Sequence, residues 1–271
     1  MNTWVDGIPC EQVSVFDRGL QFGDGLFETM RIVDADVPLL DRHIQRLSAG
    51  CERLGIAMPD EDILRREVNC VASLHTNGVL KLIVNRGDSR RGYRCPQDSH
   101  SKRVMYYSEL PVYPREFTAR ICRMPLSQNK TLAGIKHLNR LEQVLARREW
   151  DDPEIHEGIM LDVDGMVIEG ISSNIFLLHQ GLLLTPKLDR SGVTGIMRQL
   201  LMEIAQQQGL RCEISTVNKE ALISADAVFL TNSLMGMRPV SRIIGLRDYS
   251  APGREYQKIN RLICNYFKEK I

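Results

Sequence analysis

Lys136 is the residue of this chain best suited to covalent chemistry. After it, apolar residues recur at helical spacing, because Ile135 is followed by Leu138, Leu141 and Leu145, with polar residues between them. The pattern predicts a helix with Lys136 where its apolar and polar faces meet. Partial loss of water lowers the pKa of a lysine and makes its amine a usable nucleophile or base. The alternative is a solvated lysine at the start of a surface helix.

A candidate anion site lies in the run Ser191–Arg198, where a helix is expected from about Thr194 to Gln207. The first amides of a helix have no intrahelical acceptor and lie at the positive end of its dipole. Gly195 has no side chain that would keep a ligand away from the backbone. The sequence therefore predicts that an anion can bind here.

The stretch Leu132–Ala146, together with Asn174 and separated motifs between about Val5 and Val240, resembles the 4-amino-4-deoxychorismate lyases. These enzymes are a branch of the fold-type-IV pyridoxal-phosphate (PLP) enzymes. In that family the lysine that matches Lys136 holds PLP. The resemblance therefore implies that Lys136 is both the catalytic residue and a cofactor-binding residue.

The other cofactor contacts are also implied by the resemblance. Glu169, in the run Ile168–Phe176, matches the glutamate that pairs with the PLP ring nitrogen, where its negative charge would keep that nitrogen protonated. The phosphate is implied to be bound by the backbone amides of Ile196 and Met197 and by the side chains of Arg46, Asn232 and Ser233. The residue types alone leave other readings open: a turn glutamate at Glu169, a solvent-facing helix arginine at Arg46, and a turn cap at Asn232.

The glycine-rich segment Asp17–Thr29 matches a segment found across fold type IV. Its glycines let the backbone pass close to a ligand. Phe22, Phe27 and Thr29 are expected to border the substrate side, and Phe22 and Thr29 are the substrate-binding candidates. A glycine-rich hairpin with core phenylalanines would account for the same residues.

The loop Arg86–Tyr93 resembles a loop of the lyase branch, and Arg91 and Tyr93 match its substrate-binding positions. Ser89 and Arg90 depart from the pattern, because glycines are usual at both positions. A basic loop suits a substrate with two carboxylates. A solvated hairpin tip is the alternative.

Composition favours a small-molecule enzyme. The 271 residues carry 35 basic and 34 acidic side chains, a net charge of +1, so no long-range field favours nucleic acid or an anionic membrane. The seven cysteines are scattered without a Cys-x-x-Cys pair, which argues against a disulfide framework or a structural zinc site, and no metal is expected. The chain has no signal-like start and no run of eighteen apolar residues, so a cytoplasmic protein is expected.

The elements that must position these residues fall into two groups on either side of a break at Pro111–Pro114. Before the break the patterns predict strands at Trp4–Val5, Thr29–Val33, Val79–Asn85 and Val104–Ser108 and helices over about residues 40–54 and Glu61–Leu74. After it they predict the helix at Lys136, the helix from Thr194, and strands at Ala119–Met124, Gly158–Asp162, Met166–Ile168, Asn174–Leu178, Leu182–Thr185 and Ala227–Thr231.

Together with the resemblance, these elements imply a two-domain protein of mixed α+β and α/β character. Residues 1–113 are expected to form an antiparallel sheet with flanking helices. Residues 119–271 are expected to form a PLP-anchoring pseudo-barrel with helices outside, after a linker at residues 114–118.

The function that the resemblance implies is conversion of 4-amino-4-deoxychorismate to 4-aminobenzoate and pyruvate, a step of folate biosynthesis, by a homodimer. An aminotransferase of the same fold, acting on D-alanine or branched-chain amino acids, is the alternative, since the lysine, glutamate and phosphate site are common to both. A third possibility is a catalytically silent protein that binds PLP or another small molecule.

Overall fold

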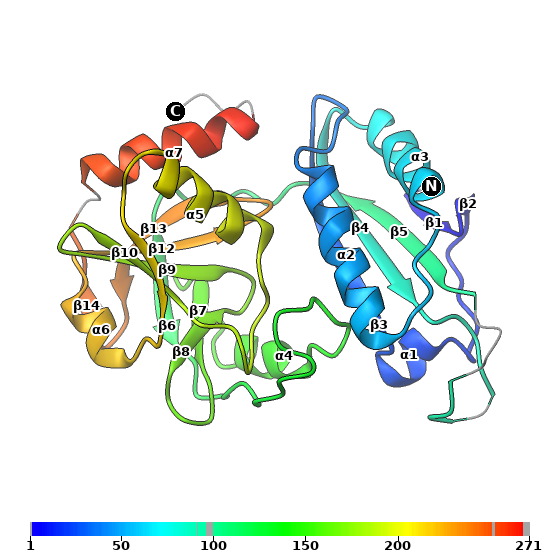
Figure 1. Cartoon of the computed structure of the whole chain (residues 1–271), viewed down its shortest axis with the longest axis horizontal. Coiled ribbons are helices and arrows are strands. Elements are labelled where there is room, and N and C mark those ends of the chain that lie inside the picture. The colour runs from blue at the N-terminus through cyan, green and yellow to red at the C-terminus, as the bar shows by residue number, and fades with distance from the viewer. Residues whose placement is uncertain (1, 91, 96–99, 251–252, 268–271) are drawn as a thin grey trace. The chain divides into compact units, whose positions relative to one another are not determined.

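The computed structural model describes residues 2–90, 92–95, 100–250 and 253–267 (Figure 1). The chain forms two compact units. The first unit consists of Met1–Pro111 and Ile135–Asn139, and the second of Val112–Gly134 and Arg140–Ile271. The expected linker residues 114–118 thus fall within the second unit. A short segment around Lys136 falls within the first unit, although it lies far along the chain.

The first unit is built on an antiparallel sheet with strand order β2-β1-β5-β4-β3. Helix α2 packs on β3, and helix α3 packs on β4. The strands are β1 (Thr3–Val5), β2 (Ile8–Pro9), β3 (Gly25–Val33), β4 (Asn77–Asn85) and β5 (Lys102–Ser108), and the helices are α1 (Arg18–Phe22), α2 (Leu40–Leu54) and α3 (Glu61–Ser73).

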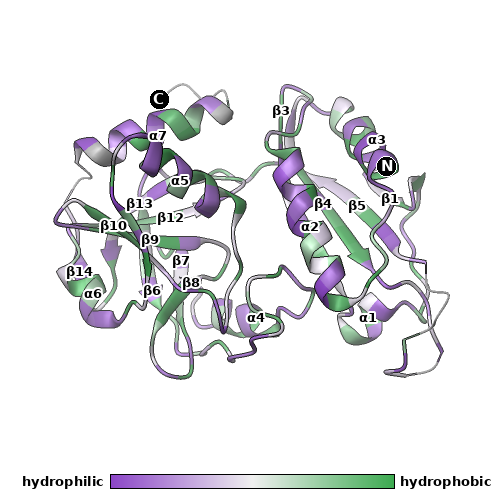
Figure 2. Cartoon of the chain, in the orientation of Figure 1, coloured by the Kyte–Doolittle hydropathy of each residue, from purple (hydrophilic) through white to green (hydrophobic). Residues whose placement is uncertain are grey.

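Buried apolar side chains at alternate positions of β3 explain why α2 packs on this strand. Leu26, Met30 and Ile32 are almost completely buried, and successive side chains of a strand point to opposite faces. The apolar stripe of α2 covers this face, and Gly50 lets the helix approach closely, since a Cβ there would lie 2.8 Å from a methyl of Leu26. Figure 2 shows the same division, with largely hydrophobic central strands and helices that carry both polar and apolar residues.

The segment Ile135–Asn139 belongs to the first unit because its backbone pairs with the start of β3. The Phe27 N–H donates to the Lys136 carbonyl and the Leu138 N–H donates to the Gly25 carbonyl, each at 2.9 Å. The Asn139 side chain donates to the Gly23 carbonyl at 3.2 Å. Lys136 is therefore not on a helix, and the expectation of a helix there was wrong. A backbone that pairs with a strand cannot also make helical i to i−4 hydrogen bonds.

The helix that follows, α4 (Leu141–Arg147), also differs from the expected face pattern. Gln143 and Ala146 are its buried residues, whereas Leu141 is 69% exposed and Leu145 is 38% exposed. Helix α4 thus starts after the residues that pair with β3, and Ile135 and Leu138, which formed part of the expected helical stripe, are not helical. Ala146 packs in a buried cluster with Trp150 and Met160.

The second unit is a mixed sheet that curls on itself. Its strand order is β11-β10-β9-β12-β13-β6-β7-β8, with β14 paired to β13. The strands are β6 (Phe117–Ile121), β7 (Glu157–Leu161), β8 (Val167–Gly170), β9 (Asn174–His179), β10 (Leu182–Pro186), β11 (Cys212–Ser215), β12 (Ala227–Asn232), β13 (Gly236–Ile243) and β14 (Arg247–Asp248). A bridge between Val167 and Val217 connects β8 with the chain that leaves β11, and so joins the two ends of this order.

Helices lie on the outside of this sheet (Figure 1). Helix α5 (Ile196–Gln207) packs on β12, helix α7 (Arg254–Tyr266) packs on β13 and on α5, and α6 (Lys219–Ser224) packs on β9. The predicted fold class, with an antiparallel N-terminal sheet and a barrel-like C-terminal sheet, is confirmed. The patterns did not predict α1, α6, α7 or β13. In the part of the chain that the structure describes, no helix has the length and apolar character needed to cross a membrane.

Candidate active site

Lys136 lies in an irregular segment of the first unit, half-buried, with its Nζ 4.5 Å from the centroid of the Phe27 ring. Gly25 makes this position possible. A Cβ at Gly25 would lie 2.7 Å from the Val84 carbonyl oxygen and 2.8 Å from the Leu138 side chain. The glycine in this motif thus allows the chain that carries Lys136 to approach β3.

Lys81 is a second cation on the same aromatic ring. Its Nζ lies 4.7 Å from the Phe27 centroid and 5.6 Å from the Tyr106 centroid. Lys81 was not among the site residues expected from the sequence. The sequence feature that could have pointed to it is a single lysine within the otherwise apolar run Val79–Val84 of β4, where the structure shows it half-buried.

A cluster of charged and polar side chains lies between β3 and α2. Glu28 accepts hydrogen bonds from His43 Nδ1 at 2.7 Å and from Arg46 Nε at 2.8 Å, and the Arg46 Nη2 also contacts it. Burial alone raises the pKa of the Glu28 carboxyl, but the Arg46 charge and the bonds from His43 and Arg46 lower it to about 2. Glu28 is therefore ionised at neutral pH and can only accept, so His43 Nδ1 carries the proton in this bond.

His43 is neutral in this cluster, because burial lowers the pKa of its imidazole despite the neighbouring Glu28. The salt bridge thus joins Glu28 and Arg46, and it fixes the Arg46 guanidinium on α2. A binding role of Arg46 toward phosphate stays a prediction. Sequence reasoning missed Glu28 and His43. The available signal was a glutamate at an inward position of β3, which needs a cation, and the helical i, i+3 spacing of His43 and Arg46.

In the second unit, Glu169 is 3% exposed on β8. Its Oε2 accepts the Val193 N–H at 2.8 Å and the Asn174 side-chain amide at 3.4 Å. Asn174 also donates to the Val193 carbonyl at 2.9 Å. Two motifs that are separate in the sequence therefore meet, and together they orient one buried carboxylate.

The start of α5 adjoins this group. Gly195 is the N-cap and makes no side-chain cap, and Ile196 and Met197 are the first two residues of the helix. A Cβ at Gly195 would lie 1.9 Å from the Asn174 Oδ1, so only glycine lets Asn174 hold its position. The backbone here has the arrangement expected of an anion site, because the first amides of a helix have no intrahelical acceptor and the cap residue has no side chain.

Asn232 and Ser233 follow the end of β12. The Asn232 side chain donates to the Ser172 carbonyl at 3.1 Å and accepts the backbone N–H groups of Leu234 and Met235 at 2.9 Å. Asn232 thus caps a turn and ties it to the loop after Glu169. Binding of phosphate by Asn232 and Ser233 stays a prediction.

The expected substrate residues lie in the first unit. Phe22 ends α1, and its ring lies 5.4 Å from that of Tyr93, which is 88% exposed. Thr29 is half-buried on β3, two residues from Phe27 and so on the same face of the sheet. Arg91 lies outside the described residues.

Comparison with known proteins gives a consistent result. A family model described as amino-transferase class IV matches residues 25–243. The aminodeoxychorismate lyase of Vibrio harveyi is 32% identical over 246 residues, which cover 89% of this chain and 90% of that protein. The D-alanine aminotransferase of Bacillus licheniformis is 29% identical over 258 residues, 93% of this chain and 91% of that protein. A crystal structure of 4-amino-4-deoxychorismate lyase from Pseudomonas aeruginosa is 41% identical, with a TM-score of 0.92, and the match covers 97% of this chain and 98% of that chain.

The Glu28 cluster gives a stability prediction. Glu28→Gln should lower the free energy of unfolding by about 3 kcal/mol at neutral pH, because removing one partner of a buried ion pair leaves the other charge uncompensated. Glu28 has a pKa of about 2 in the folded protein against an ordinary value of 4.5. Its contribution is therefore present above about pH 4.5 and is lost as the pH falls toward about 2. Urea unfolding should show a difference between variant and parent that shrinks as the pH is lowered.

The matched control is Glu61→Gln, which removes an exposed carboxylate that pairs with Arg65 at 2.7 Å in the same unit. This change should alter stability little, because exposed pairs contribute little. Equal losses in the two variants, or a Glu28→Gln loss that does not depend on pH, would contradict the proposed charge state of the cluster.

Proposed function

We propose a lyase function for this chain, which belongs to the amino-transferase class IV family. It converts 4-amino-4-deoxychorismate to 4-aminobenzoate and pyruvate, a step toward folate, with PLP as its cofactor. The observation that carries this function is the likeness to aminodeoxychorismate lyases in sequence and structure, which extends over nearly the whole length of both chains. The lyase motif around Lys136, with the run Lys136–Gln143, supports the same choice.

The donor groups of the chain fit PLP. A PLP enzyme needs a lysine amine, a carboxylate for the ring nitrogen and a phosphate site. The half-buried amine of Lys136, the buried and oriented carboxylate of Glu169, and the first amides of α5 at Ile196 and Met197 meet these needs. We assign the remaining phosphate contacts to the side chains of Arg46, Asn232 and Ser233.

When bound, PLP supplies an electron sink for the substrate carbon that bears the amine. Lys136 Nζ removes the proton from that carbon as general base. Glu169 supports this step, because its charge holds a proton on the ring nitrogen, and the Val193 N–H keeps the carboxylate in one orientation. The enolpyruvyl C–O bond lies β to the same carbon, and its cleavage, with protonation of the enol methylene, releases pyruvate. The remaining ring becomes aromatic, so no amino acceptor is needed.

The substrate has two carboxylates and a ring, and we assign its binding to Phe22, Thr29, Arg91 and Tyr93. The support is the exposed Tyr93 ring beside Phe22 and the position of Thr29 on the same strand face as Phe27. We further propose that the protein works as a homodimer in the cytoplasm, with a small molecule as its substrate and without nucleic-acid or membrane partners. The near-neutral net charge and the family resemblance support these assignments.

An aminotransferase is the second candidate, because a D-alanine aminotransferase resembles this chain over a similar length. Both reactions use a lysine, a carboxylate and a phosphate site, so those residues do not separate them. The need for an amino acceptor does separate them.

The deciding experiment is to incubate the PLP-loaded protein with 4-amino-4-deoxychorismate alone and to measure 4-aminobenzoate and pyruvate. The lyase forms both in equal amounts without an oxoacid. The control incubation contains D-alanine and an oxoacid. Pyruvate formed only in that control, with no 4-aminobenzoate from the first mixture, would make the aminotransferase the correct assignment.

Replacement of Glu169 tests the chemistry. Glu169→Gln should leave PLP bound but lower kcat on the order of a hundredfold, because a neutral amide cannot keep the ring nitrogen protonated. The matched control is Glu213→Gln, which changes an exposed carboxylate of the same unit that pairs with Arg211. Absorbance of bound PLP and kcat are measured for both. Near-parental kcat in Glu169→Gln would remove Glu169 from the mechanism.

A further inference from the structure

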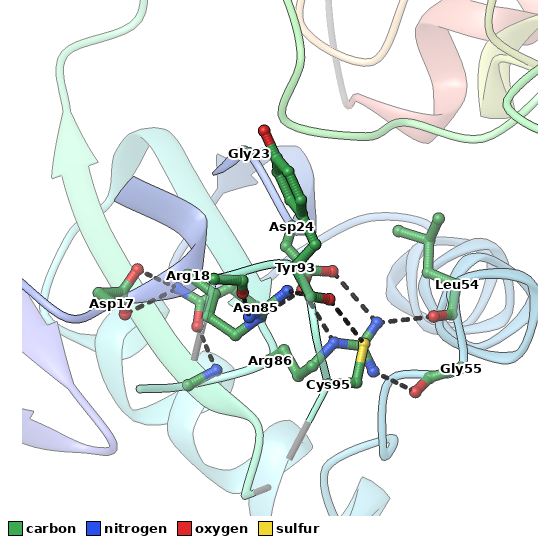
Figure 3. Close-up of polar contacts among 12 residues, drawn as sticks. Asp17, Arg18, Gly23, Asp24, Leu54, Gly55, Asn85, Arg86, Tyr93 and Cys95 are labelled. Atoms are coloured by element: carbon green, nitrogen blue, oxygen red, sulfur yellow. Dashed lines mark hydrogen bonds and ion pairs between the residues drawn. The ribbon is translucent and has the colours of Figure 1, made fainter. Parts of the chain in front are cut away.

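A buried arginine holds the backbone of the loop that contains Tyr93 (Figure 3). Arg18, the first residue of α1, is 3% exposed. Its Nε donates to the Asp24 carboxylate at 2.7 Å, its Nη1 donates to the Gly92 carbonyl at 2.6 Å, and its Nη2 contacts the Tyr93 carbonyl at 3.4 Å. One guanidinium thus connects the glycine-rich segment with two successive residues of the loop.

The first residues of the loop, Gly87 and Ser89, are attached to the start of α1 and the residues just before it by backbone hydrogen bonds. The Arg18 N–H donates to the Gly87 carbonyl and the Ser89 N–H donates to the Phe16 carbonyl, each at 2.9 Å. Arg90, which stands where the lyase branch usually has glycine, lies over the Phe16 ring at 4.4 Å. The region around α1 therefore holds the start of the loop, and the Arg18 side chain also holds its later residues Gly92 and Tyr93.

Asp24 orients Arg18 and is itself fixed. Arg86 donates to both Asp24 oxygens, at 2.8 and 3.1 Å, and also to the carbonyls of Leu54 and Gly55 at the end of α2. Burial raises the pKa of the Asp24 carboxyl, but the two arginines lower it below its ordinary value. Asp24 is therefore a fixed negative charge, and it holds the Arg18 guanidinium in the direction of the loop.

The side chain that this arrangement presents is Tyr93. Its carbonyl is held by a buried charged group, whereas the residue as a whole is 88% exposed and its ring lies beside that of Phe22, with centroids 5.4 Å apart. Burial of a charge is costly unless the charge is well paired. A loop that only faces solvent would not be expected to be held by a buried arginine. A fixed backbone under an exposed aromatic ring lowers the entropy lost when a ligand binds.

We infer that Arg18 is a positioning residue for substrate binding, which acts by holding the Gly92 and Tyr93 carbonyls so that the Tyr93 phenol meets the substrate. This inference rests on the proposed function. A phenol ring packs against a flat ring and its hydroxyl donates to a carboxylate. The ligand class that Tyr93 suits is therefore a ring carboxylate, such as an amino-cyclohexadiene carboxylate, in preference to a small aliphatic amino acid.

The test uses the full-length PLP-loaded protein with Arg18→Gln, Arg18→Lys and the control Arg65→Gln. Arg65 is a surface arginine of the same unit that pairs with Asp41 and Glu61. Loss of two hydrogen bonds from a charged group should raise amide hydrogen exchange in a peptide covering residues 87–95 about tenfold. KM for 4-amino-4-deoxychorismate should rise by a similar factor, with kcat within about twofold of the parent. Arg18→Lys should behave like Arg18→Gln, because an ammonium is a point donor without the guanidinium fork, and it replaces Arg18→Gln if that variant does not fold.

A double-mutant cycle with Tyr93→Ala identifies the route of the effect. If Arg18 acts through Tyr93, adding Arg18→Gln to Tyr93→Ala should leave KM unchanged from Tyr93→Ala alone. Multiplied KM effects in the double variant, a fall in kcat without a rise in KM, or loop exchange equal to that of the parent would overturn the inference. The exchange measurement needs no substrate. A parent protein that forms no 4-aminobenzoate would refute the proposed function and the substrate class, whereas unchanged exchange would refute the role of Arg18 alone.

Discussion

The backbone pairing between the start of β3 and the segment that carries Lys136 is the interaction on which the described site depends. Two hydrogen bonds of 2.9 Å, from Phe27 to the Lys136 carbonyl and from Leu138 to the Gly25 carbonyl, bring residues about 110 positions apart into contact. They fix the lysine backbone, so that its amine lies over the Phe27 ring. Without a glycine at position 25 the two segments could not approach this closely.

Strand β3 also separates a buried, charge-paired face from a half-buried one. On one face Glu28 is buried in its salt bridge with Arg46, and on the other face Phe27 and Thr29 are half-buried. A similar arrangement recurs at the part-buried Asp24 and at the buried Glu169, where a carboxylate is held by several donors. Carboxylates that accept several hydrogen bonds in a poorly solvated site are held in one orientation. Arg46 and Glu169, two of the groups assigned to the cofactor, are thus held in place by neighbouring residues.

The sequence predicted the fold class, the family and most strands, because the alternation of apolar residues and the glycine motifs are local signals. It failed at Lys136, where spacing predicted a helix and the structure has a segment paired with β3. Long-range pairing of this kind has no local signal. The partners of Glu28 and Arg18 were missed for the same reason, since a carboxylate at an inward strand position shows only that some cation must approach. The meeting of Glu169 with Val193 and Asn174 likewise depends on how β8, β9 and the loop before α5 come together.

The most direct test of the central claim is to find the residue that carries the cofactor. The PLP-loaded protein should be yellow, borohydride should remove the visible band, and peptide mapping should then find the reduced cofactor covalently attached to Lys136 alone. Lys81 is the informative comparison, because its amine lies over the same Phe27 ring at 4.7 Å. A label on Lys81, Lys130 or Lys187, or no covalent label at all, would contradict the assignment of Lys136 as the reactive lysine.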